Sequence, residues 1–179
     1  MAIITHFPTL DTILVRWQSE LGGDLNAYRN HCYRVANFCV ALGDDDAETR
    51  EIVSIAVAFH DLGIWSDRTY DYLGPSRRLA RAYLEECGLV TWVDRIEAMI
   101  ELHHKLRSSD VRRRDLVERF RRADWIDVTR GLLHFGLPAA FIADVLATFP
   151  NAGFHRRLAQ LSMQRFCTHP WSPLPMLRL

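Results

Sequence analysis

The sequence predicts an all-α fold with about eight helices. Apolar residues recur three or four positions apart through most of the chain, which is the spacing of a helix face that packs against a core. No stretch of useful length alternates apolar and polar residues as a half-buried strand does. Glycines interrupt the periodic runs at Gly43, Gly63 and Gly88, as they do at helix C-termini.

Most of the expected helices also have a start signal. Thr9 and Thr91 are suitable N-caps, Pro75 and Pro138 suit a first helical position, and the acids at 44–46 favour a helix N-terminus because of the helix dipole. The expected helices cover about residues 9–22, 25–42, 44–61, 75–87, 92–106, 112–131, 138–148 and 154–167.

Length and composition are those of one globular domain. The chain has 179 residues, of which 49% are hydrophobic and 25% charged, which is enough to form a core. We expect a single domain over 1–179, with residues 25–130 at its centre and the last helices and a Pro-rich tail in 138–179. Residues 64–74 are expected to form a loop or a short turn of helix.

Charge and cysteine content restrict the partners and the compartment. Lys plus Arg and Asp plus Glu each number 22, so bulk electrostatics does not favour a polyanion. No run approaches the roughly 20 apolar residues of a membrane span, and the N-terminus lacks the basic region of a signal peptide. The four cysteines are scattered, with no CxxC. We expect a cytoplasmic protein without a membrane partner.

Three polar residues lie on apolar faces of three different expected helices. His31 precedes Val35 by four positions, Asp124 follows Phe120 by four, and His60 lies on the apolar face of its own helix. Burying a carboxylate or an imidazole costs free energy unless the group is paired or coordinated. A single such histidine is usually just hydrogen-bonded in a core, but three helices that each direct one inward favour a shared site.

The adjacent residues His60 and Asp61 can supply two ligands to one ion. Consecutive helical residues point about 100° apart, so both reach one ion only near a helix end, which Gly63 provides. Imidazole and carboxylate ligands suit Mn, Co, Ni, Fe or Zn. With His31 and Asp124 as further ligands, an octahedral ion keeps positions for water and substrate, as in a catalytic site.

The ordered pattern His…His-Asp…Asp resembles the HD-domain superfamily of metal-dependent phosphohydrolases. The matching segments read NHCYRVANF around His31, AFHDLG around His60 and Asp61, and RRADWID around Asp124, and the likeness covers about residues 25–130. The resemblance implies an all-α bundle of HD type, a divalent metal held by those four residues, and phosphoester hydrolysis. By analogy with the family, Asp61 would orient the attacking metal-bound water.

The chain contains the pair His103–His104 but lacks another histidine of the full two-metal pattern of some relatives. Those relatives have a further histidine after the HD pair, whereas the corresponding region here reads YLGPSRRLARAYL. His103 and His104 could contact the substrate beside one metal, form part of a second metal site, or lie near a helix C-terminus because of the dipole. We favour one metal, with both histidines facing the substrate.

Charged residues near the motif are candidates for phosphoryl binding and proton transfer. Arg68, Lys105 and Arg107 could stabilise charge on the phosphoryl group. Asp67 lies in the loop after the HD pair and could act in catalysis as proton donor to the leaving group. For each of the four, a solvated loop charge is the alternative interpretation.

Two further features have an ordinary interpretation that we favour. The stretch RRRDLVERFRR, residues 112–122, contains six arginines, but its acids and the zero net charge favour a solvated helix face over a nucleic-acid groove. Trp65, Tyr70 and Tyr72 could stack on a base or pack the loop onto the bundle. Trp92 and Trp125 are expected in the core.

The sequence thus predicts a metal-dependent phosphohydrolase for a small phosphomonoester, with a nucleotide as the favoured substrate, and nucleic acid is not the expected partner. Alternatives are a di-iron oxygenase or a small-nitrile hydratase on the same scaffold, a nuclease, or a non-catalytic metal-stabilised binding module. The sequence does not determine the oligomeric state, and a homodimer is one alternative.

Overall fold

The computed structural model describes residues 1–105 and 116–171, and all of the regular secondary structure in these residues is helical. This confirms the predicted all-α fold. Eight of the helices have nine residues or more, and α2 and α5 have four each. The helices are α1 (Pro8–Arg16), α2 (Gln18–Leu21), η1 (Gly22–Asp24), α3 (Leu25–Ala41), α4 (Ala47–Phe59), α5 (Gly63–Ser66), α6 (Leu73–Glu86), η2 (Val90–Trp92), α7 (Val93–Leu102), α8 (Leu116–Val128), α9 (Ala139–Thr148) and α10 (Phe154–Thr168).

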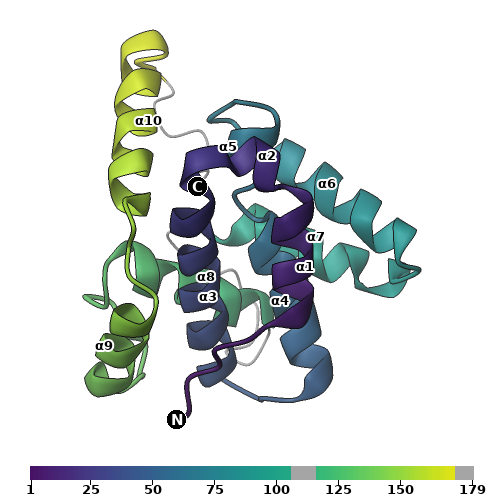
Figure 1. The fold of residues 1–179 in the computed structure, drawn as a ribbon, viewed down its shortest axis with the longest axis vertical. Helices are drawn as coiled ribbons and strands as arrows, with labels where there is room; N and C mark the ends of the chain where they lie inside the picture. Colours follow the sequence, from purple (N-terminus) through teal and green to yellow (C-terminus); the bar gives the residue numbers. More distant parts are fainter. Residues whose placement is uncertain (106–115, 172–179) are drawn as a thin grey trace.

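Helix α3 runs through the centre of the molecule, with α4 and α8 against it and α7 against both α4 and α8 (Figure 1). Its residues 31–40 are buried without interruption, and this run includes the polar residues His31, Arg34 and Asn37. Helix α4 begins at an N-cap, because the carboxylate of Asp46 accepts a hydrogen bond from the backbone N–H of Thr49 at 2.8 Å. These central helices carry the polar residues described below.

The segment after α4 differs in part from the prediction. Gly63 not only follows α4 but begins the single turn α5, and α6 begins at Leu73, two residues before Pro75. A Cβ atom at Gly63 would lie 2.6 Å from the carbonyl oxygen of Tyr72, so only glycine allows α5 and α6 to approach this closely. The backbone N–H of Gly63 donates to the Ser76 hydroxyl at 3.0 Å, which holds the turn in place.

The N-terminal helix also starts and ends differently from the prediction. Phe7 is the N-cap and Pro8 the first residue of α1, since the Thr9 hydroxyl instead donates to the Glu51 carboxylate at 2.7 Å. The expected helix 9–22 is divided at Trp17 into α1 and α2. The first residues of the expected helix 112–131 lie outside the described part of the chain, and α8 is described from Leu116.

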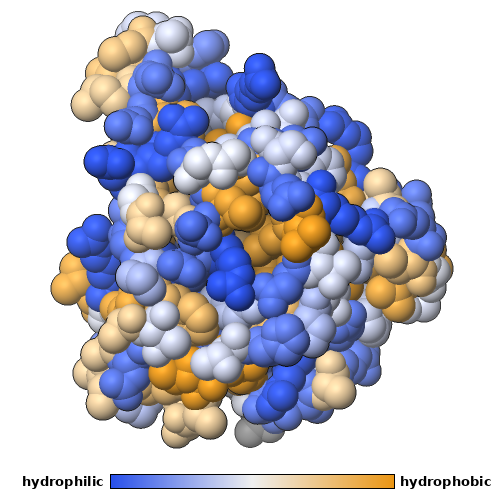
Figure 2. Space-filling model, viewed as in Figure 1, coloured by the Kyte–Doolittle hydropathy of each residue, from blue (hydrophilic) through white to orange (hydrophobic). Residues whose placement is uncertain are grey.

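Helix α10 lies along one side of the molecule, above α9 in the view of Figure 1, and its upper part stands clear of the other helices. Phe154, at its start, is the buried residue of this helix. The projecting part presents both hydrophobic and hydrophilic residues at the surface (Figure 2). None of the helices in the described residues combines the length and apolar character needed to cross a membrane.

Candidate metal centre

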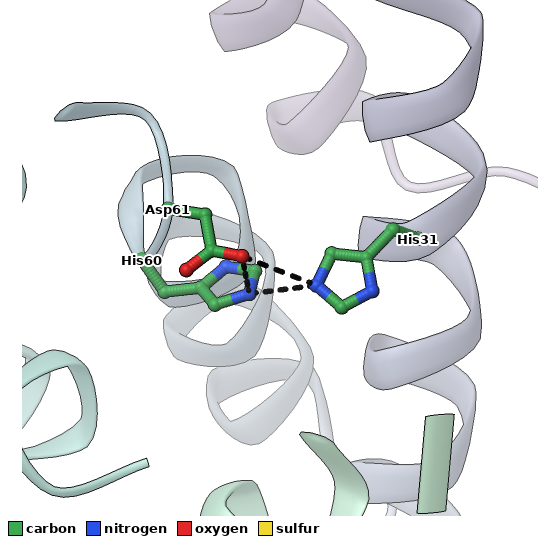
Figure 3. A group of neighbouring side chains, drawn as sticks. All are labelled: His31, His60 and Asp61. Carbon is green, nitrogen blue, oxygen red and sulfur yellow. Dashed lines mark hydrogen bonds and ion pairs between the residues drawn. The ribbon is translucent and has the colours of Figure 1, made fainter. Parts of the chain in front are cut away.

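The structure brings together the four residues predicted as metal ligands. His31 comes from the middle of α3, His60 and Asp61 from the end of α4, and Asp124 from α8, and all four are buried. The Nε2 atoms of His31 and His60 are 2.9 Å apart, and Oδ2 of Asp61 lies 3.6 Å and 3.5 Å from them (Figure 3). Oδ1 of Asp124 lies 3.7 Å from His31 Nε2 and 3.9 Å from His60 Nε2.

The histidines present lone pairs to this centre because their other ring nitrogens are already engaged. Nδ1 of His31 lies 2.7 Å from a carboxylate oxygen of Asp127, and Nδ1 of His60 lies 2.8 Å from the carbonyl oxygen of Val57. These oxygens only accept, so each neutral ring carries its proton on Nδ1 and an unshared pair on Nε2. Two such pairs facing each other at 2.9 Å repel unless a cation or a proton lies between them.

The carboxylates of the cluster are buried without enough partners. Oδ1 of Asp61 and both carboxylate oxygens of Asp124 have no hydrogen bond from any described residue. An unpaired buried carboxylate is costly, and coordination to a metal is one of the few ways to stabilise it. Together with the lone pairs of the two histidines, these oxygens form a set of nitrogen and oxygen donors that fits a divalent transition-metal ion.

The metal-free cluster has strongly shifted pKa values. Burial lowers the pKa of His60 to about 3, so this ring is neutral near pH 7 and able to bind a cation. Burial raises the pKa of Asp124 to about 7. For Asp61, burial alone would raise the pKa, but the neighbouring His60 and His103 outweigh it and hold the pKa well below its usual range.

His103 and His104 approach the same cluster from the end of α7. His103 is buried, its Nδ1 lies 2.6 Å from the carbonyl oxygen of Ile100, and its Nε2 lies 3.4 Å from Oδ1 of Asp61. Asp61, His103 and His104 form a second group whose donor atoms are close enough to hold an ion, and it shares Asp61 with the group of His31 and His60. Both the substrate-facing and the second-metal interpretations are compatible with this placement.

Asp127 and Arg34 support the centre and were not predicted. Asp127 accepts from His31 on one side and from Arg34 Nε and Nη2 on the other, the last at 2.9 Å. Arg34 also donates to the carbonyl oxygen of Phe149 at 2.9 Å, which ties the centre to the end of α9. The spacing contains a signal for both, because Arg34 follows His31 by three residues and Asp127 follows Asp124 by three, so each pair shares a helix face.

A cavity of about 250 Å³ opens beside the centre and has mainly apolar walls. It is lined by His31, Asp61, Tyr70, Tyr72, His104, Trp125, Val128, Phe154, His155, Leu158, Ala159 and Ser162. Trp125, expected in the core, is only half buried and forms part of the wall. Tyr70 and Tyr72 line the cavity, which is compatible with both the stacking and the packing interpretations, and their hydroxyls hydrogen-bond to Ser162 and His104 at 2.6 Å and 2.7 Å.

The four loop charges expected near the phosphoryl group have different positions. Asp67 is exposed and accepts from Ser66 and Arg78, both at 2.8 Å, and these hydrogen bonds lower its pKa, so its geometry does not favour a proton donor at the centre. Arg68 lines a neighbouring cavity. Within the described residues Lys105 is not part of the wall beside the centre, and Arg107 lies outside the described residues.

The arginine-rich segment is not a solvated face where it is described. Arg119, Arg121 and Glu118 are buried on α8. Glu118 accepts from Arg121 and from Arg122 at 2.8 Å, and Arg121 also donates to the carbonyl oxygen of Lys105 at 3.0 Å. An acid three and four positions before two arginines neutralises them within the helix, and this pairing allows their burial.

The fold and the centre define the class of protein: an all-helical protein whose buried histidines and aspartates can hold a divalent cation. The HD-domain family model matches residues 28–129, more than half of the chain, so the chain belongs to the HD-domain family. This match confirms the resemblance that the sequence motifs indicated. This family belongs to a superfamily of metal-dependent phosphohydrolases. No curated protein and no solved structure matches the chain.

Proposed function

We propose that the chain is a metal-dependent phosphohydrolase acting on a small phosphomonoester, with a nucleotide as the favoured substrate. The observation that supports this most directly is that the Nε2 atoms of His31 and His60 converge with two buried carboxylates, each with at least one oxygen that has no hydrogen bond from a described residue. A divalent cation bound there supplies Lewis acidity toward a phosphoryl oxygen and makes water a nucleophile near neutral pH.

The chain's own residues hold and orient these groups. His31, His60, Asp61 and Asp124 would be the ligands, and Asp127 holds the ring of His31 through its Nδ1–H. Asp61 uses Oδ2 toward the two histidines, while its Oδ1 faces His103 and has no hydrogen bond within the described residues. That oxygen would orient the attacking water and accept its proton.

The cavity favours a small substrate with an apolar or aromatic part. A cavity of about 250 Å³ is large enough for a compact organic group but too small for a polynucleotide. Tyr70, Tyr72 and Trp125 supply aromatic surface on which a base or another flat group could lie. His104 also lines the cavity, so it would contact the substrate beside the centre.

A two-metal enzyme of different chemistry is the second candidate. It is favoured by the group Asp61, His103 and His104, and by Nε2 of His103, which is buried without a hydrogen bond from any described residue. Two iron ions per chain and a requirement for dioxygen would identify an oxygenase. One ion per chain, or two ions with phosphoester hydrolysis, would exclude that alternative.

The test combines elemental analysis with an activity screen. We would compare the purified wild type, Asp61→Asn and the control Asp94→Asn, which changes an exposed acid of α7. After reconstitution with Mn²⁺, Co²⁺, Ni²⁺, Fe²⁺ or Zn²⁺, we expect stoichiometric metal and hydrolysis of 4-nitrophenyl phosphate and nucleoside monophosphates. Asp61→Asn should lower kcat/KM by about a thousandfold and reduce bound metal, with the helical circular dichroism retained.

Two results would contradict the proposal. One is a metal-loaded wild type that hydrolyses no phosphoester in the screen, which would favour a binding module. The other is retention of activity in Asp61→Asn at the level of Asp94→Asn, because the reaction would then not depend on the centre.

A further inference from the structure

A second, larger cavity lies next to the cavity of the metal centre. It has a volume of about 670 Å³ and is formed by the α5 turn, the loop after it and the outward part of α10. Tyr70 is the one described residue that lines both cavities, and its hydroxyl is 2.6 Å from that of Ser162 on α10. The side chain of Tyr70 therefore forms the partition between the two spaces.

The charge of the second cavity is positive. Arg68, Arg157 and Arg165 line it, and Glu20 is the one acid among its described lining residues. Asp24 lies behind this wall, where its Oδ2 is 3.1 Å from Arg157 Nε and accepts from the indole N–H of Trp65 at 2.9 Å. Asp24 thus pairs with Arg157, one of the three arginines that line the cavity.

Arg68 combines strain with a lack of partners. Its backbone has φ of 52°, in the left-handed region that residues other than glycine seldom occupy. Its side chain is exposed and makes no hydrogen bond or ion pair with any described residue. A strained backbone that directs an unpaired guanidinium into a cavity is typical of a ligand-binding position.

Helix α10 connects the two cavities. Leu158, Ala159 and Ser162 line the cavity beside the metal centre, whereas Arg157 and Arg165 line the second one, so adjacent faces of one helix contribute to both. A ligand that extends past Tyr70 could place one end at the metal centre and the other among the arginines. Guanidinium groups bind phosphate oxygens through paired N–H donors, which a carboxylate-lined or apolar cavity cannot do.

We infer that the second cavity is a phosphate-binding subsite, and that the substrate of the metal centre therefore carries a second phosphate group beyond its apolar part. The second half of this inference rests on the proposed function, whereas the first half does not depend on catalysis. The substrate class narrows from any small phosphomonoester to a compound with two separated phosphates, of which one is hydrolysed at the metal centre and the other is held by Arg68 and Arg165.

The binding test uses inorganic phosphate and protein treated with a chelator, so that the metal centre cannot hold the anion. We would follow the side-chain Nε–H signals of arginines by NMR in the wild type, Arg68→Gln, Arg165→Gln and the control Arg156→Gln. Arg156 is exposed on α10 and lines neither cavity, so it loses the same charge without touching the subsite. We expect saturable binding that weakens about five- to tenfold in Arg68→Gln and Arg165→Gln but not in Arg156→Gln.

The kinetic test compares a nucleoside 5′-monophosphate with the matching 3′,5′-bisphosphate on the metal-loaded enzyme. Arg68→Gln should raise KM for the bisphosphate about five- to tenfold more than KM for the monophosphate, whereas Arg156→Gln should leave both KM values unchanged. Equal phosphate affinity in Arg68→Gln and Arg156→Gln, or no saturable binding, would overturn the subsite. Phosphate binding that requires Arg68 in a protein without any hydrolase activity would support the subsite and refute the proposed function.

Discussion

Two buried carboxylates on one helix have opposite surroundings. Asp127 receives hydrogen bonds from Arg34 and His31, whereas Asp124, one turn earlier on α8, has no hydrogen bond from any described residue. Burial by itself would raise the pKa of both, but His31 and Arg34 hold the pKa of Asp127 well below its usual range, while that of Asp124 rises to about 7.

The two regions differ in whether the chain itself supplies the charge partners of the buried carboxylates. The Arg34–Asp127 region is complete in itself, since every charge in it has a partner of opposite sign within the chain. In the region of Asp61 and Asp124, Nε2 of His31 lies 3.6 Å and 3.7 Å from the two carboxylates without a hydrogen bond, so a further cation would complete this region. The chain buries Arg34 beside Asp127 but provides no hydrogen bond to Asp124 within the described residues. A metal ion is therefore the favoured partner of Asp124.

The largest expected effect on the free energy of unfolding comes from removing Arg34, the charged partner of Asp127. Arg34→Met should lower the free energy of unfolding by about 3–5 kcal/mol, because it leaves Asp127 buried and without its cation. Urea unfolding of the metal-free protein measures this. The control Arg78→Met removes an exposed arginine that pairs with Asp67, and it should cost under about 1 kcal/mol. Equal losses in the two variants would show that Arg34 is not a structural partner of Asp127.

The second prediction concerns the incomplete region. Asp124→Asn should raise the unfolding free energy of the metal-free protein at pH 7 by about 1–3 kcal/mol, because the amide removes a buried carboxylate charge that has no hydrogen bond within the described residues. The same variant should lose the stabilisation that Mn²⁺ or Zn²⁺ gives the wild type, about 2.7 kcal/mol at a hundredfold excess over Kd. Thermal unfolding with and without metal tests both statements, and unchanged metal stabilisation would remove Asp124 from the ligand set.

The two aspartates should also differ in the pH dependence that they contribute. The raised pKa of Asp124 means that the folded state binds the proton more tightly, so this group stabilises the metal-free protein below about pH 4 and that contribution is lost as the pH rises to about 7. The lowered pKa of Asp127 has the opposite sign: its contribution is present above about pH 4 and is lost as the pH falls further.

Unfolding free energies measured from pH 3 to pH 8 separate these contributions. Relative to Asp124→Asn, the metal-free wild type should lose stability between about pH 4 and pH 7, by at most about 1.4 kcal/mol per pH unit. Relative to Asp127→Asn, it should lose stability only below about pH 4. Parallel pH profiles for the wild type and both variants would mean that Asp124 and Asp127 have the same environment, which would contradict their opposite pKa shifts.

Helical periodicity was sufficient to predict the central elements and the convergence of their polar residues. His31, His60 and Asp124 each interrupt an apolar stripe, and such an interruption is visible from spacing alone because the buried face of a helix repeats every 3.6 residues. The position of Asp61 also followed, since it lies where α4 ends. These are local properties of single helices, which a sequence displays directly.

Relations between helices were harder to predict. The burial of Arg121 depends on Glu118 and on a carbonyl group of another segment, and composition alone indicated a solvated face. The half-buried wall position of Trp125 depends on α10, which lies far away in the sequence. Asp127 was detectable as a neighbour of Asp124 on the same face, but its function becomes visible only when Arg34 from α3 is placed beside it.

The smallest expected effect concerns the loop after the HD pair. Asp67→Asn should keep kcat on a nucleoside 5′-monophosphate, whose alkoxide leaving group needs a proton, within about twofold of the wild type, because its carboxylate is engaged by Arg78 and Ser66 at the surface and does not line the cavity of the metal centre. General acid catalysis by a side chain contributes about a hundredfold or more, so a kcat loss of that size, together with loss of the alkaline limb of the pH–rate profile, would restore Asp67 as the proton donor. The outcome decides whether the exposed loop or only the buried cluster supplies proton transfer.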